Sequence, residues 1–84
     1  MIRRELEASV VYKCYVTFKN GVRKFVRINY DMVARMTAAF RNFQKCIYEE
    51  TWLLPVSGFI LNVSEVKSMR FVNESTGLEL LTVE

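Results

Sequence analysis

Residues 9–29 read SVVYKCYVTFKNGVRKFVRIN, two runs of alternating apolar and polar side chains on either side of Asn20-Gly21. Alternation with a period of two predicts a half-buried strand, and an Asn-Gly step between two such runs predicts a β-hairpin. We therefore expect the first two elements of the fold to be paired antiparallel strands. The apolar positions of the first run are Val10, Tyr12, Cys14, Val16 and Phe18.

The register of this hairpin follows from the side chains that would share each face. A two-residue turn would place Arg23 and Arg27 on the apolar face, mixing charge with core. A three-residue loop with Gly21 in the left-handed conformation pairs Phe18 with Val22 instead, and keeps the apolar residues of both strands together. We predict this bulged register.

A helix is predicted from Met32 to Cys46, with Asp31 accepting a hydrogen bond from the open N–H groups of its first turn. Its apolar stripe consists of Met32, Met36, Phe40, Phe43 and Ile47. After a turn around Pro55 and Ser57-Gly58, three further strands are predicted over Phe59–Leu61, Lys67–Val72 and Leu78–Val83, with a short crossing turn over Asn62–Val66 between the first two.

The predicted element order is ββαβββ, which is typical of the α+β class. We expect an antiparallel sheet of about five strands with one amphipathic helix packed on one face; a curl toward a small barrel is the main alternative. A chain of 84 residues has room for one domain. Residues 1–8 are expected to form a flexible arm or a short helical turn.

The composition excludes several kinds of chemistry. The sequence has no His and only two Cys, so neither a Ser-His-Asp triad nor a common zinc site can be built. The three glycines are isolated from one another, so no phosphate-binding glycine-rich loop is present. We therefore expect a protein without cofactor or metal that is not an enzyme. Polar residues follow Met1-Ile2 at once and no apolar run approaches a membrane span, which favours a cytoplasmic protein with no membrane partner.

Charge is unevenly distributed along the chain. Between Lys13 and Lys45 eight basic residues stand against Asp31 alone, whereas from Cys46 to Glu84 two basic residues stand against six Glu. In the predicted register the basic residues alternate with aromatic ones on the hairpin face opposite Cys14. The predicted pairs on that face are Lys13 with Arg27, Tyr15 with Phe25 and Thr17 with Arg23.

This face has three interpretations. It suits a polyanion such as nucleic acid, because cations engage phosphates and aromatic rings stack on bases. It is also compatible with a plain solvated surface, or with a dimer in which the basic hairpin meets the acidic half of a second copy. The candidate residues for binding a polyanion or a partner protein are Lys13, Tyr15, Lys19, Arg23, Phe25 and Arg27.

The primary functional hypothesis is a small, non-catalytic protein-interaction module that forms a homodimer. Apolar residues make up 51% of the chain, more than a domain of this size easily buries. Its sheet and helix surfaces would also bind another protein. Binding of nucleic acid through the basic and aromatic hairpin face is the first alternative. The second is a small anionic ligand in a dimer cleft, with Arg35 and Arg41 as candidate contacts.

Overall fold

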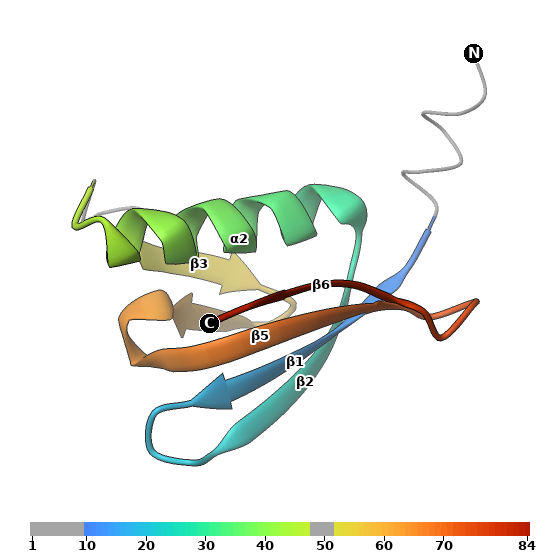
Figure 1. Ribbon diagram of the computed structural model, residues 1–84, viewed down its shortest axis with the longest axis horizontal. Helices are drawn as coiled ribbons and strands as arrows, with labels where there is room; N and C mark the ends of the chain where they lie inside the picture. Colours follow the sequence, from blue (N-terminus) through green and yellow to red (C-terminus); the bar gives the residue numbers. More distant parts are fainter. Residues whose placement is uncertain (1–9, 48–51) are drawn as a thin grey trace.

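The computed structural model describes residues 10–47 and 52–84, so the predicted arm over residues 1–8 lies outside the described part. One helix lies across one face of a four-stranded antiparallel sheet of order β2-β1-β5-β6, beside a separate two-stranded hairpin (Figure 1). The elements are β1 (Tyr12–Phe18), β2 (Arg23–Ile28), α2 (Tyr30–Gln44), β3 (Leu53–Val56), β4 (Phe59–Asn62), η2 (Val63–Glu65), β5 (Val66–Asn73) and β6 (Glu79–Val83). The predicted α+β class is confirmed; within the described residues no strand pairing closes the sheet into a barrel.

The first hairpin adopts the predicted register. Thr17 pairs with Arg23, and the Phe18 amide donates to the Val22 carbonyl at 2.8 Å. The Gly21 amide donates to the Phe18 carbonyl at 2.9 Å, and Gly21 has a φ of +89°, which a side chain at this position would strain. The three-residue loop therefore depends on the glycine that the sequence supplies.

The helix begins two residues earlier than predicted, because Asn29 caps it and not Asp31. The Asn29 side-chain oxygen accepts a hydrogen bond from the Met32 amide at 2.9 Å. Asp31 instead lies in the first helical turn, where its carboxylate is 3.2 Å from Arg35 Nε and faces the positive end of the helix dipole. Asn and Asp are equally good N-cap residues, so the residue type alone does not show whether position 29 or position 31 caps the helix.

The other end of α2 is closed by a Schellman motif. The Ile47 amide donates to the Asn42 carbonyl at 2.8 Å and the Cys46 amide to the Phe43 carbonyl at 3.0 Å. Cys46 takes the left-handed conformation, with φ of 55°, at the position where glycine is usual. The helix therefore ends at Gln44, and Ile47, predicted to extend the buried stripe, is exposed.

The segment around Pro55 is a strand and not the turn that its sequence predicts. Pro55 pairs opposite Ile60 in the β3–β4 hairpin, whose two-residue turn is Ser57-Gly58. Both turn residues have positive φ, 32° and 90°, as in the tight turns that match strand twist. Proline is tolerated because this small sheet has only two strands, so every strand has a free edge.

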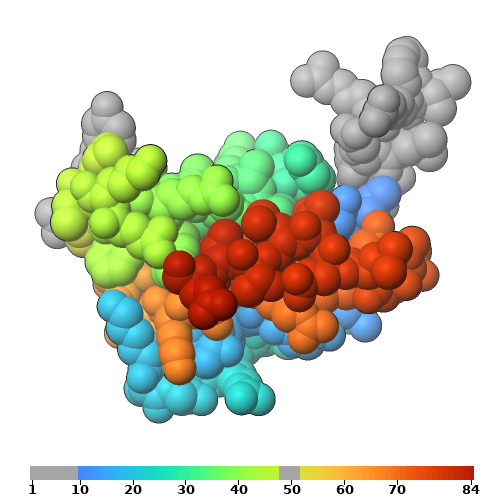
Figure 2. Space-filling view, viewed as in Figure 1, coloured from blue at the N-terminus to red at the C-terminus, as the bar shows by residue number. Residues whose placement is uncertain are grey.

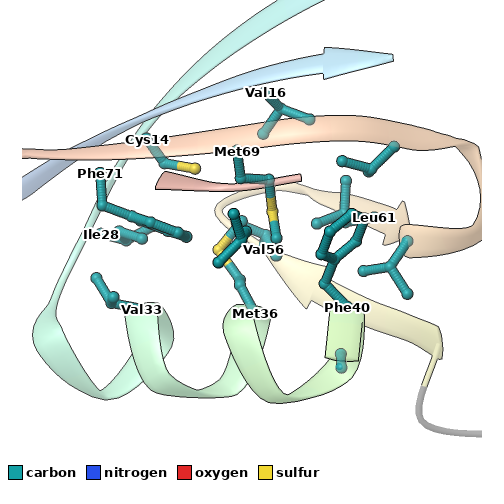
Figure 3. Packing of buried hydrophobic residues seen from close by; sticks show 14 of the residues in the cluster. Cys14, Val16, Ile28, Val33, Met36, Phe40, Val56, Leu61, Met69 and Phe71 are labelled. Atoms are coloured by element: carbon teal, nitrogen blue, oxygen red, sulfur yellow. The ribbon is translucent and has the colours of Figure 1, made fainter. Parts of the chain in front are cut away.

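The core lies between α2 and the sheet (Figure 3). Cys14 and Val16 of β1 point toward the helix, together with Met69 and Phe71 of β5. The helix contributes Val33, Met36, Thr37, Ala39 and Phe40, whereas the predicted Met32 and Phe43 are only partly buried. The β3–β4 hairpin and η2 close the side of the core with Val56, Leu61 and Val63. The predicted apolar face is thus confirmed within β1 and β2, whereas Val22 is exposed and Val10 lies before β1, outside the core.

Replacing Phe40 with Ala should lower the free energy of unfolding by about 3–5 kcal/mol, since truncating a buried ring removes its transfer free energy and leaves a cavity. Phe40 is 3% exposed. Chemical denaturation measures the loss. The control is Arg35→Ala on the exposed side of the same helix, which should cost well under 1 kcal/mol. Equal effects of the two variants would show that the buried face of α2 is assigned wrongly.

Replacing Cys46 with Gly should raise the free energy of unfolding by up to about 1 kcal/mol. Removing the side chain relieves the left-handed strain, and the greater freedom of glycine in the unfolded chain offsets part of the gain. Cys46→Ser, which keeps the β-carbon, should leave stability unchanged. Destabilisation by glycine, measured in the same denaturant series, would contradict the assigned helix end.

Candidate binding surfaces

The face of the sheet that points away from α2 gathers the basic and aromatic residues into three cross-strand rows. Because α2 and the β3–β4 hairpin cover the other face, alternation along each strand sends these side chains outward. The rows are Arg23–Thr17–Ser68, Phe25–Tyr15–Arg70–Thr82 and Arg27–Lys13–Val72–Glu79. We call the residues of these rows the outer face. A groove of about 450 Å³ on it is lined by Tyr15, Phe25, Arg23, Ser68, Arg70 and Thr82.

An aromatic pair lies at the centre of the outer face. The rings of Tyr15 and Phe25 have their centroids 5.3 Å apart and their planes inclined by 40°. Arg27 lies over the Phe25 ring and Arg70 over the Tyr15 ring, each with its guanidinium carbon 5.6 Å from the centroid. Both rings remain partly open, with Tyr15 40% and Phe25 44% exposed.

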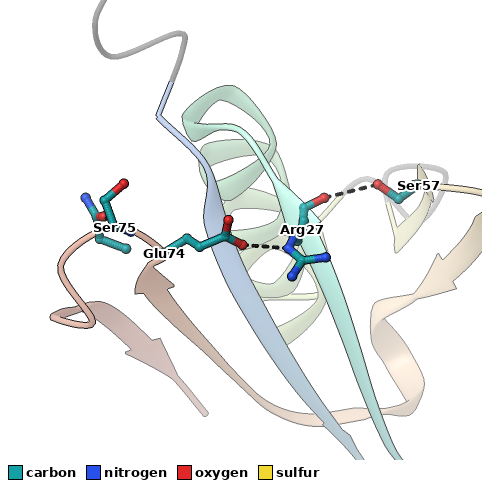
Figure 4. A network of polar contacts seen from close by, with 5 residues as sticks. Arg27, Ser57, Glu74 and Ser75 are labelled. Atoms are coloured by element: carbon teal, nitrogen blue, oxygen red, sulfur yellow. Dashed lines mark hydrogen bonds and ion pairs between the residues drawn. The ribbon is translucent and has the colours of Figure 1, made fainter.

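Two of the four cations on the outer face are in ion pairs. Arg27 Nε is 2.6 Å from a Glu74 carboxylate oxygen, while the Arg27 carbonyl accepts a hydrogen bond from the Ser57 hydroxyl at 3.3 Å (Figure 4). Arg70 Nε is 3.1 Å from a Glu79 carboxylate oxygen. Neither Lys13 nor Arg23 forms an ion pair within the described part of the chain. Exposed ion pairs are weak, so all four cations can reach an anion.

The structure separates Lys19 from the other predicted residues. Its Nζ lies 5.0 Å from the centre of the Phe43 ring, on the side of the sheet that α2 covers. Lys13, Tyr15, Arg23, Phe25 and Arg27 share the outer face, as their register predicts. Sequence reasoning missed Ser68, Arg70 and Thr82, because nothing local in the sequence shows that β5 pairs with β1.

A second candidate surface runs along β6 and α2. Tyr30, Ala34, Ala38 and Arg41 of the helix line a groove of about 390 Å³ with Leu80 and Leu81 of β6. In Figure 2 the red atoms of the C-terminal strand lie along the green atoms of α2 on the face of the molecule that is turned to the viewer. We call this surface the β6 edge. Leu80 is 45% exposed, and neighbouring Leu78 and Tyr30 are also exposed.

The two predicted anionic-ligand contacts do not share this groove. Arg41 lines it, whereas Arg35 is absent from its lining and pairs with Asp31. A small-anion site at a dimer cleft stays a prediction, with Arg41 as its basic residue.

Two kinds of group in the described residues bear on reactive chemistry: metal-ligating side chains and the buried thiol of Cys14. No group of three or more metal-ligating side chains gathers within residues 10–47 and 52–84. Burial raises the pKa of the Cys14 thiol from 9.0 to about 12, which removes it as a nucleophile near neutral pH. In the same ranges no helix is long and apolar enough to cross a bilayer.

No protein-family model, curated protein or solved structure gives a significant match to this chain.

The two thiols should differ sharply toward a disulfide reagent near neutral pH. Cys46 is exposed and should react readily, whereas Cys14 is buried and neutral and should react only after the chain unfolds. A Cys46→Ser variant isolates Cys14 for the measurement. Rapid labelling of Cys14 in that folded variant would show that the β1–α2 core opens easily.

Proposed function

We propose that this chain is a non-catalytic interaction module that forms a homodimer by pairing the β6 strands of two copies. The observation that supports the proposal is an unoccupied sheet edge beside an apolar helix face. Within the described residues β6 pairs with β5 and with no other strand. Exposed apolar side chains next to an open edge are typical of association surfaces.

The contrast between the two edges of the sheet supports β6 over β2. Strand β2 carries Arg23, Lys24 and Arg27, and charged side chains protect an edge against pairing. The Ser57 hydroxyl also donates to the Arg27 carbonyl, so the β3–β4 turn covers part of that edge. Strand β6 carries one charged residue, Glu79, against three in β2, and the Gln44 side chain holds its end to the helix by donating to the Glu84 carbonyl at 2.8 Å. The β6 edge is therefore both available and held in place.

The helix favours a second copy of this chain as the partner. Antiparallel pairing of two β6 strands about a two-fold axis extends the sheet and brings the two α2 helices together on one side of it. The exposed small side chains of Ala34 and Ala38, one helical turn apart, allow close approach of the helices. Leu80 and Tyr30 supply exposed apolar surface, and a two-fold symmetric interface would bury this surface on both copies.

Light scattering on a size-exclusion column tests the dimer. The expected mass is twice the 9.9 kDa of the chain, and it should persist at high salt because the contact is apolar. Leu80→Lys should give a folded monomer. The control is Leu53→Lys, since Leu53 is 54% exposed on the other, two-stranded sheet and its replacement should leave the dimer intact.

Two results would overturn this proposal. One is a wild-type monomer at both low and high salt. The other is a dimer that Leu53→Lys dissociates and Leu80→Lys does not, which would place the interface on the β3–β4 hairpin. Circular dichroism of each variant separates loss of the dimer from loss of the fold.

A further inference from the structure

We propose that the outer face binds single-stranded nucleic acid, with Tyr15 and Phe25 stacking on bases and Lys13, Arg23, Arg27 and Arg70 engaging phosphates. This inference is independent of the dimer. The β6 edge lies at one side of the sheet, so pairing through it leaves the outer face open. A dimer would place two outer faces on the same side of one extended sheet.

The position of the aromatic pair carries the proposal. Tyr15 and Phe25 lie opposite each other on adjacent strands, in the middle of the three rows, and neither ring is needed to fill the core. A pair of partly exposed rings on a solvent-facing sheet surface is open to base stacking, because every base has an aromatic face. The flanking guanidinium groups of Arg27 and Arg70 extend this stacking surface.

The cations are arranged to hold a backbone that crosses the aromatic pair. Arg23 lies in the row on one side of the pair, and Lys13 with Arg27 lies in the row on the other. Successive outward residues of a strand are about 7 Å apart. The backbone positions of these cations are therefore about 7 Å from those of the aromatic pair, along the strands in both directions. The hydroxyls of Thr17, Ser68 and Thr82 add hydrogen-bond partners between the charges.

The same geometry disfavours two other anionic partners. A DNA duplex is read by elements that enter its grooves, and its stacked bases offer no face to Tyr15 or Phe25. An acidic peptide could satisfy the cations but has no bases to stack on the aromatic pair. Glu74 and Glu79 already lie beside Arg27 and Arg70, so the carboxylates of an acidic peptide would only replace contacts of the same kind.

Fluorescence anisotropy with a labelled oligothymidylate and the full chain tests this proposal. Binding should weaken as salt rises, with a logarithmic slope of about −0.7 for each phosphate engaged. Tyr15→Ala should weaken binding roughly 5- to 150-fold with little change in that slope, because it removes stacking and leaves the charges. Tyr15→Phe keeps the ring and should bind like the wild type. This control shows whether the loss in Tyr15→Ala comes from the missing ring and not from any change at position 15.

Charge removal gives the second arm of the experiment. Arg23→Ala should weaken binding and make the salt slope less steep, because one phosphate contact is lost. Lys45→Ala removes the same charge from the end of α2, away from the outer face, and should have little effect. A duplex of equal length and a polyglutamate competitor should both bind more weakly than the single strand.

Several outcomes would overturn the proposal. Absence of salt-dependent binding to single strands is the first. Equal losses for Arg23→Ala and Lys45→Ala, with none for Tyr15→Ala, would mean attraction to overall positive charge alone. Polyglutamate competing as well as DNA would assign the face to an acidic protein segment, and equal affinity for the duplex would exclude stacking as its basis.

Discussion

The antiparallel pairing of β1 with β5 is the contact on which the rest of the structure depends. It sets Cys14 beside Phe71 and Val16 beside Met69, four side chains at the centre of the core. Strands β2 and β6 attach to either side of this central pair, and α2 packs across it. The two strands are separated in sequence by the helix and the β3–β4 hairpin, so the entropy of closing that loop must be overcome before the core can form.

The same pairing also builds the outer face. Because side chains alternate along a strand, the register that buries Cys14 and Val16 must send Tyr15 to the opposite side, directly across from Arg70. A basic and aromatic surface thus comes from strands at both ends of the chain. A shift of one residue between β1 and β5 would expose the core and bury these charges together.

The alternation of apolar and polar residues predicted the first hairpin and its outward side chains, whereas the helix cap, strand β3 and the order of the strands were not predicted. The register of the first hairpin and the Gly21 loop followed from local alternation, and so did six of the residues that share the outer face. The cap at Asn29 was mistaken for Asp31, since both side chains can accept the same hydrogen bond. Strand β3 was missed because Pro55 resembles a turn residue, and Arg70 was missed because strand order has no local signal.

The junction between β2 and α2 has a consequence for how such a chain can change in length. Strand β2 ends at Ile28 and the helix begins at Tyr30, so a single residue joins the two layers. Inserting one residue inside the first helical turn would rotate the remainder of α2 by about 100°. That rotation would bring Arg35 into the place of Met36 and the small side chain of Ala39 into the place of Phe40. Changes in length are far easier to accommodate at the tips of the hairpins, where the backbone turns outside the core.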